Sequence, residues 1–177
     1  MTHPIASAGW TLLVHGGAGS MSRANLTAQQ DAVARAGLHA ALDAGESILA
    51  NGGSALDAVE AAVRVLEDDP HFNAGRGAVF TYEGRIELDA AIMDGATRDA
   101  GAVAGVTATR NPVTLARAVM DHSPHVLLAR EGADRFAIEQ GVEQVDPAWF
   151  ITPERTRQLD ELKARPGGDY YDVDMKY

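Results

Sequence analysis

The stretch Pro70–Phe80, which reads PHFNAGRGAVF, limits the possible folds of this 177-residue chain more than any other part of it. Helix-forming residues precede it, and Pro70 ends that helix because proline lacks an amide hydrogen and clashes with the preceding turn. Gly75 and Gly77 then let the backbone turn tightly and adopt positive φ angles. The sequence therefore predicts a compact loop directly after a helix.

Two kinds of side chain alternate within this loop. Phe72, Val79 and Phe80 are apolar, and we expect all three to anchor the loop in apolar surroundings. Asn73 and Arg76 supply polar groups between these anchors. A polar, glycine-containing loop with apolar anchors is typical of a binding or catalytic site, although it does not define a function by itself.

The end of the preceding helix has a physical reason to attract a cation. Its last carbonyls, near Leu66 and Glu67, lack intrahelical donors and lie at the negative end of the helix dipole. Since Pro70 and the two glycines allow the loop to fold its own carbonyls inward, it could surround a hard cation with oxygen ligands alone. Water or turn hydrogen bonds could satisfy the same carbonyls, and on the residues alone that outcome is the more frequent one.

Hydrophobic periodicity and turn residues predict the other elements. A buried strand is expected at Trp10–Val14, running into a glycine loop at His15–Gly19. Helices are expected at 27–51, 55–68, 112–121, 131–140 and 152–164. A hairpin of two strands is expected at 85–93 and 102–108, and a further short, buried strand at 125–129.

The same periodicity predicts which residues of these elements are buried. Apolar residues share one side of each of the first two helices: Leu38, Leu42, Ile48 and Leu49 in the first, and Leu56, Val59, Val63 and Leu66 in the second. In the hairpin, the small residues Ala104 and Gly105 predict close packing against another layer.

Composition and charge exclude several functional classes. The net charge is −10 and the basic residues are scattered, which argues against a nucleic-acid partner. The absence of cysteine excludes disulfides, thiolate metal sites and a cysteine nucleophile, and fits a cytoplasmic protein. We expect no signal peptide and no membrane segment, because no basic and apolar leader and no run of about 18 apolar residues occurs. Ser22 replaces the third glycine of a dinucleotide-binding motif.

The chain contains no convincing catalytic set. Four serines are explained as loop or cap residues: Ser20, Ser22, Ser54 and Ser123. Three histidines lie on separate segments, without the spacing of zinc ligands: His15, His71 and His125. Asp89 and Asp94 could act as paired carboxylates, but hydrogen bonding at strand ends is their more frequent role. A well-formed site region without a nucleophile is therefore the main feature to explain.

Several motifs occur here in the order found in one known family. They are LVHGGAG at 13–19, GSALDAV at 53–59, FNAGRG at 72–77, LDA at 88–90, MDG at 93–95, GAVAGV at 101–106, NP at 111–112 and SPHV at 123–126. With these motifs, roughly residues 10 to 145 resemble the plant-type L-asparaginases, also called isoaspartyl peptidases.

The resemblance implies an α+β fold, the αββα four-layer sandwich of N-terminal nucleophile (Ntn) hydrolases. Such proteins are made as precursors that undergo autocatalytic cleavage before a threonine. Residues 1–165 would be the α-subunit part of one such domain, and residues 166–177 a mobile C-terminal linker preceding the cleavage site. The implied partner is a β subunit from the same precursor, in an (αβ)2 heterotetramer.

The activity implied by the resemblance is hydrolysis of β-aspartyl (isoaspartyl) dipeptides and of the side-chain amide of L-asparagine. The nucleophile would be the N-terminal threonine of the β chain, acting on a small-molecule substrate without an organic cofactor. This interpretation explains why the present chain shows no catalytic set of its own.

Residue matching to the family also implies site residues. A structural sodium ion would be bound by the main-chain carbonyls of six residues: Leu66, Glu67, Asp69, Phe72, Ala74 and Arg76. Arg76 stands where relatives often have an aliphatic residue, but only its carbonyl is needed. Asn73 matches an asparagine that reaches toward the nucleophile. His15, Gly16 and Gly17 match the glycine loop beneath the active site.

Other hypotheses remain open at this point. A glycosylasparaginase-like amidase shares the GSALDAV and MDG motifs, although that family is typically secreted with disulfides. A threonine-type endopeptidase of the same fold is a weaker rival. A non-catalytic, cation-binding subunit is also compatible with a chain that carries no nucleophile.

Overall fold

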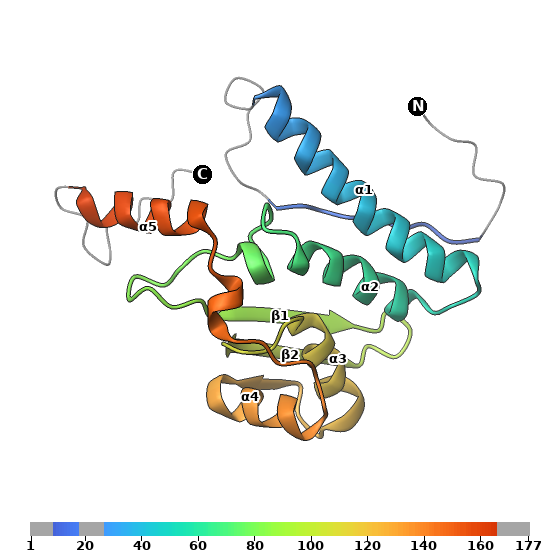
Figure 1. The fold of residues 1–177 in the computed structure, drawn as a ribbon. Coiled ribbons are helices and arrows are strands. Elements are labelled where there is room, and N and C mark those ends of the chain that lie inside the picture. The colour runs from blue at the N-terminus through green and yellow to red at the C-terminus, as the bar shows by residue number, and fades with distance from the viewer. Residues whose placement is uncertain (1–8, 18–26, 166–177) are drawn as a thin grey trace.

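The computed structural model describes residues 9–17 and 27–165, which form a mixed helix and sheet structure (Figure 1). The elements in chain order are α1 (Ala28–Ala50), α2 (Ala55–Asp68), the 3-10 helix η1 (Gly75–Gly77), β1 (Leu88–Met93), β2 (Ala100–Val106), α3 (Pro112–His122), β3 (Leu127–Ala129), α4 (Arg130–Glu139), the 3-10 helix η2 (Pro147–Phe150) and α5 (Pro153–Ala164). Ala18, Gly19 and the linker expected at 166–177 lie outside the described residues. No helix in the described ranges is both long and apolar enough to span a membrane.

Local sequence signals set the helix ends as expected. The hydroxyl of Thr27 accepts a hydrogen bond from the Gln30 amide at 3.2 Å, and Gln30 Oε1 accepts one from the Thr27 amide at 2.9 Å. This capping box starts α1. Ser54 caps α2 by accepting from the Asp57 amide at 3.1 Å, and Thr152 caps α5. Prolines occupy the first turns of α3 and α5, where a missing amide hydrogen costs little.

Helices α1 and α2 approach each other through small residues. The buried residues of α1 are Gly37, Ala41 and Gly45, which recur every four positions on one face. A Cβ atom at Gly45 would lie 2.9 Å from the carbonyl oxygen of Ala58 on α2. The predicted apolar side of α1 is correct, but its leucines and isoleucine are only half-buried, because the closest contacts belong to these small residues.

The predicted apolar stripe of α2 is partly wrong. Leu66 is buried, and Leu56 and Val63 pack against the larger hydrophobic core. Val59 is 37% exposed instead, and the small residues Ala58 and Ala62 are buried. Since α1 covers the face that carries the two alanines, the buried surface of α2 is rotated relative to the large-residue stripe.

The expected hairpin is confirmed and is joined by the short third strand. The sheet has the order β1-β2-β3, with β1 antiparallel and β3 parallel to β2. The register changes between Leu88 and Ala90, where β2 carries an extra residue. Gly105 adopts a φ of 66° there, and its amide donates to Asp89 Oδ1 at 2.8 Å. A residue in this left-handed conformation is favoured to be glycine, so Gly105 forms a bulge.

The close packing predicted at Ala104 and Gly105 occurs instead at Gly101. A Cβ atom at Gly101 would overlap the carbonyl oxygen of Ala116 and lie 2.5 Å from the Met120 amide nitrogen, both on α3. Gly101 is buried, and Ala104 is only half-buried. The glycine that allows a helix to approach the sheet is therefore the one near the start of β2.

The larger core lies between the sheet and α3. Val103 of β2 packs with Leu115 and Val119 of α3, and Phe150 of η2 is completely buried in the same cluster. Ala137 brings α4 into this cluster as well. Figure 1 shows α1 and α2 next to β1, and α4 at the opposite end of the sheet, beyond β2.

The other face of the sheet and the N-terminal segment are exposed. The register places Ala91, Ala102 and Leu127 in one row, and Met93 on the same face is 58% exposed. Leu127 is 55% exposed, so the prediction that 125–129 is buried is wrong, because this row faces away from the helices. The strand expected at Trp10–Val14 is extended, with alternating exposure, but pairs with no other strand in the described residues. Leu13 is 88% exposed, so the prediction of a buried strand is wrong for this structure.

The close approach of α3 to the sheet can be tested by a substitution at Gly101. Gly101→Ala is expected to lower the free energy of unfolding by about 3 kcal/mol, because the new methyl group overlaps α3 backbone atoms. Gly132→Ala in α4 is the matched control, since nothing lies within 4 Å of its added Cβ, and it should leave stability equal or about 1 kcal/mol higher. Denaturant unfolding measures both. Equal stability of Gly101→Ala and wild type would contradict the close approach.

Candidate functional site

The loop that follows α2 begins with a side-chain turn at Asp69. Its Oδ1 accepts from the His71 amide at 2.9 Å and contacts the His71 ring nitrogen at 2.7 Å. Its carbonyl oxygen accepts from the Phe72 amide at 3.3 Å. The aspartate thus reverses the chain around Pro70, as short polar side chains commonly do in turns.

Two glycines close the loop against its own carbonyl oxygens. Gly75 has a φ of 48°, and a Cβ atom there would overlap the carbonyl oxygen of Glu67. A Cβ atom at Gly77 would overlap the carbonyl oxygen of Phe72 and lie 2.7 Å from that of Pro70. Carbonyl oxygens from the first half of the loop therefore face its second half at distances that only glycine permits.

The predicted cation site remains a prediction, and the structure describes the surroundings of four of its six proposed carbonyl ligands. Glu67 and Phe72 are two of its six proposed ligands, and their oxygens face the glycines. The carbonyls of Asp69 and Ala74 each accept one hydrogen bond, from Phe72 and Gly77, which leaves each a second lone pair. Among the described residues no cluster of three or more histidine, aspartate or glutamate side chains could hold a metal. A cation site in the described residues would therefore not consist of three or more such side chains.

The predicted apolar anchors of the loop differ in burial. Phe72 is 6% exposed and belongs to a small core with Ala41, Ala62 and Leu66. Phe80 packs against the larger core, but Val79 is 50% exposed, so the prediction that it anchors the loop is wrong. Phe72 and Phe80 thus attach the two ends of the loop to two different cores.

Asn73 connects the two arms of the loop. Its Oδ1 accepts from the Val79 amide at 3.0 Å, and the residue is at the surface. This hydrogen bond places the Val79 backbone beside the turn. The predicted role of Asn73 toward a nucleophile remains a prediction, and the structure shows what fixes its position.

The N-terminal glycines lie against the same loop. A Cβ atom at Gly16 would be 2.9 Å from Cε1 of Phe72. Gly17 has a φ of 110°, and its amide donates to His15 Nδ1 at 3.1 Å. The structure therefore brings together two segments that the sequence separates by more than fifty residues, His15–Gly17 and the Asn73 loop.

Glu67 carries a buried carboxyl group that sequence reasoning missed. The residue is 3% exposed, and its Oε1 accepts from the Val113 amide in the first turn of α3 at 2.9 Å. Its Oε2 has no hydrogen-bond partner within the described structure. Burial raises the pKa of Glu67 to about 7, against the lowering effect of the Val113 amide. One residue thus offers its carbonyl to the loop and its carboxyl to a helix N-terminus.

A second missed feature ties the end of α2 to the chain after β2. Arg110 binds Asp68 with two hydrogen bonds of 3.1 Å, and binds Glu143 at 2.9 Å. These bonds raise the pKa of the Arg110 guanidinium. The guanidinium groups of Arg110 and Arg76 each lie 5.4 Å from the centre of the Trp149 ring. The loop is thereby linked to η2 as well as to α2.

Most other sequence candidates have structural roles. Asp89 binds the Gly105 amide, and Asp94 binds the Ala96 amide at 2.7 Å, which confirms strand-end hydrogen bonding for both. The hydroxyl of Ser123 donates to the Val119 carbonyl at the end of α3. Ser20 and Ser22 lie outside the described ranges.

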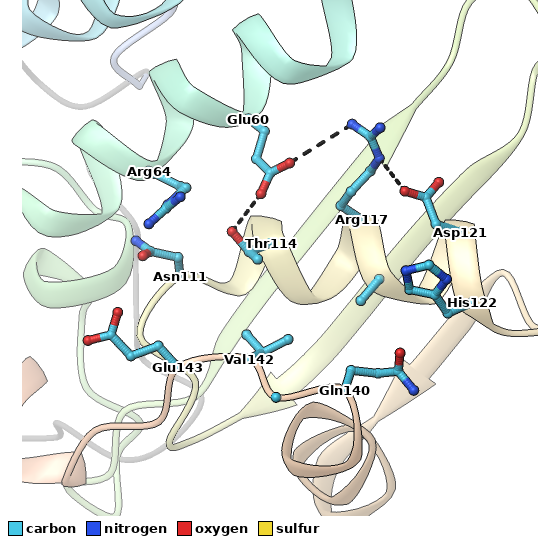
Figure 2. A pocket seen from close by; sticks show the side chains of 12 residues that line it. Glu60, Arg64, Asn111, Thr114, Arg117, Asp121, His122, Gln140, Val142 and Glu143 are labelled. Carbon is cyan, nitrogen blue, oxygen red and sulfur yellow. Dashed lines mark hydrogen bonds and ion pairs between the residues drawn. The ribbon is translucent and has the colours of Figure 1, made fainter.

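Figure 2 shows a cavity of about 360 Å³ between α2, α3 and the segment 140–143. The hydroxyl of Thr114 donates to Glu60 Oε1 at 2.7 Å, which resembles a nucleophile and base. However, Arg117 lies 3.9 Å from the same Glu60 carboxylate, so this carboxylate is part of an ion pair. The Thr114 hydrogen bond also has a structural role, because it links α3 to α2. None of the predicted site residues lines this cavity. The glycine loop remains the better candidate site.

The buried carboxyl of Glu67 predicts a dependence of stability on pH. Its pKa is about 7 in the folded protein and near 4.5 when exposed, so its contribution is fully present below pH 4.5 and is lost as pH rises through 7. The loss is about 3 kcal/mol above pH 7. Glu67→Gln should remove this part of the pH dependence of the free energy of unfolding.

Denaturant unfolding at pH 5 and pH 8 measures the effect. Glu139→Gln, at an exposed position on α4, is the control and should keep the wild-type difference between the two pH values. If Glu67→Gln and wild type lose equal stability between pH 5 and pH 8, the buried carboxyl does not titrate as described.

Known proteins are similar to this chain over most of its length. The family model described as Asparaginase matches residues 8–175. The chain is 49% identical over 158 residues to an isoaspartyl peptidase of Salmonella typhimurium, covering 89% of this chain and 50% of that protein. It is 51% identical over 157 residues to an isoaspartyl peptidase of Escherichia coli, covering 89% and 48%.

A third relative, a plant-type L-asparaginase of Thermococcus kodakarensis, is 47% identical over 156 residues, covering 87% of this chain and 48% of its own length. The chain therefore spans about half the length of the curated relatives it matches. A family match over nearly the whole chain, with such identities, confirms the resemblance, and this chain belongs to the asparaginase family.

Proposed function

We propose that this chain is the α-subunit part of a self-processed amidohydrolase. The whole protein hydrolyses β-aspartyl dipeptides and the side-chain amide of L-asparagine, with an N-terminal threonine on a β chain as nucleophile. The observation that carries the proposal is the close relationship to proteins named isoaspartyl peptidase and L-asparaginase, over a segment that contains the glycine loop. The lack of a convincing nucleophile and base among the described residues agrees with a catalytic threonine elsewhere.

A partner chain from the same precursor is supported by the exposed apolar surface. Leu13, Val126 and Leu127 are each more than half exposed, and the extended segment Trp10–Val14 pairs with no strand in the described structure. Unpaired strands and apolar sheet faces are normally covered. We infer that the β chain covers this face and pairs with this segment, which completes an αββα sandwich in an (αβ)2 assembly.

The reaction follows the chemistry of an N-terminal threonine. The free amine of that threonine takes the proton from its own hydroxyl, and the hydroxyl oxygen attacks the β-aspartyl carbonyl. The threonine amine passes this proton to the leaving nitrogen as the carbon–nitrogen bond breaks, which releases ammonia from asparagine or an amino acid from the dipeptide. Water then attacks the acyl-enzyme, frees the acid and restores the threonine.

The present chain contributes a positioned loop to this reaction. Asn73, whose amide oxygen is engaged by Val79, presents its side chain at the surface where the β chain docks. The loop is rigid because its arms contact each other at Gly75 and Gly77. Catalytic groups gain most when their neighbours are fixed in advance, so this rigidity is the chain's main contribution.

A sodium ion is part of the proposal. It would be bound by the main-chain carbonyls of Leu66, Glu67, Asp69, Phe72, Ala74 and Arg76, which are hard oxygen ligands. When bound, the ion stabilises the loop and takes no part in bond making. The carbonyl oxygens that face Gly75 and Gly77 support this assignment.

The direct test combines intact mass and turnover. Denaturing mass spectrometry with N-terminal sequencing is expected to find this chain in equal amount with a second chain that begins with threonine. The purified protein should hydrolyse a β-aspartyl dipeptide and L-asparagine, and should leave the matching α-aspartyl dipeptide intact. A protein without a threonine-initiated chain and without turnover would be the non-catalytic, cation-binding subunit, and the proposal would be wrong.

A test at Asn73 separates its two functions. Asn73→Ala should lower kcat about 100-fold through misplacement at the active site, and stability by about 1 kcal/mol through the lost hydrogen bond from Val79. Asn73→Asp keeps the acceptor for the Val79 amide but loses the amide donor. If Asn73→Asp is as active as wild type, Asn73 acts on the loop alone and does not contact the reacting groups.

A further inference from the structure

Helix α5 contacts η1 and the segment that follows it. None of its residues is buried within the described structure. Lys163 Nζ lies 5.3 Å from the centre of the Tyr82 ring, and Leu159 lies 3.8 Å from where a Cβ of Gly84 would be. Figure 1 shows α5 on the same side as the chain between η1 and β1. Because no residue of α5 is buried in the described structure, polar contacts contribute to its position beside the apolar contact of Leu159.

Arg155 makes the polar contact that reaches the candidate site. Its Nε donates to the carbonyl oxygen of Gly77 at 2.7 Å, and its guanidinium also donates to Gln158 Oε1 at 2.8 Å. Both partners are neutral, and burial lowers the pKa of Arg155. A partly buried guanidinium directed at one backbone carbonyl is a strong hydrogen-bond donor, and its bond restricts where that peptide can lie.

Arg157, the other arginine of the same helix turn, differs from Arg155 in its exposure and in its partners. Arg157 is exposed and pairs with Glu154 and Glu161, both on α5 itself. Exposed pairs within one helix contribute little to stability and hold nothing outside the helix. Arg157 is therefore a matched control for Arg155.

Gly77 occupies a decisive position in the loop. Its amide donates to the Ala74 carbonyl at 3.0 Å, and its Cα packs against the Phe72 carbonyl. Two residues further along the chain, the Val79 amide donates a hydrogen bond to Asn73 Oδ1. A shift of the Gly77 peptide would thus move the hydrogen bond that positions Asn73.

We propose that Arg155 is a positioning residue of the active site, which fixes the Gly77 peptide and through it the side chain of Asn73. This inference rests on the proposed function, because it assigns Arg155 a role in the hydrolysis of β-aspartyl substrates. Arg155 also couples α5, the last described helix, to the loop, so that the two elements move together.

The test compares Arg155→Ala, Arg155→Lys and Arg157→Ala in the full-length protein. For a β-aspartyl dipeptide, Arg155→Ala should lower kcat at least about 10-fold per folded active site, with KM within about twofold, because it misplaces a catalytic neighbour without touching substrate. Arg155→Lys, which can still donate to one carbonyl, should recover part of kcat. Arg157→Ala should match wild type.

Hydrogen–deuterium exchange of the 72–80 segment gives a readout independent of turnover. Arg155→Ala should speed exchange of the Val79 amide, and Arg157→Ala should not. Suppose that the wild type is active, and that Arg155→Ala has the same kcat as Arg157→Ala or leaves the exchange of the Val79 amide unchanged. The positioning role of Arg155 would then be wrong, while the proposed function would stand. Wild type without turnover would refute the proposed function, and the catalytic role of Arg155 with it, whatever the exchange rates.

Discussion

The contact between the loop glycines and the carbonyl oxygens of the preceding turn is the constraint on which the candidate site depends. Gly75 lies against the Glu67 carbonyl and Gly77 against the Phe72 carbonyl, at separations that exclude any Cβ atom. The loop that contains this contact also connects the two hydrophobic cores. Phe72 belongs to the small core beside α1, and Phe80 packs against the larger core between the sheet and α3. The site therefore lies where the two parts of the fold meet, and each part limits its movement.

The loop is fixed from outside by charged groups. The carboxyl of Glu67 accepts from the first turn of α3, Asp68 binds Arg110, and Arg155 donates to the Gly77 carbonyl. Each contact reaches a different element, so the loop is connected to α3, to the chain after β2 and to α5. A buried, half-satisfied carboxyl such as that of Glu67 costs stability near neutral pH, and it lies next to the site where rigidity matters most.

Sequence reasoning succeeded where the determinants are local. The Thr27, Ser54 and Thr152 caps lie within three residues of their partners, and their helices form as predicted. It missed a contact between distant residues, the Asp68–Arg110 pair, whose members are 42 apart, and it wrongly placed Val79 in apolar surroundings. Trp10–Val14 has strand composition, but a strand forms only where a partner is available, and the described chain offers none. The residue pattern of Pro70–Phe80 and the family motifs predict the same loop as the site region.

The central claim is that this chain is about half of a catalytic unit whose other half covers its exposed strand and sheet face. A crystal structure of the full-length protein tests it most directly. The account predicts that Trp10–Val14 is hydrogen-bonded within a sheet, that Leu127 and Met93 are buried by a second polypeptide, and that its N-terminal threonine lies beside Asn73. A structure in which these surfaces face solvent, with no threonine near Asn73, would contradict the account.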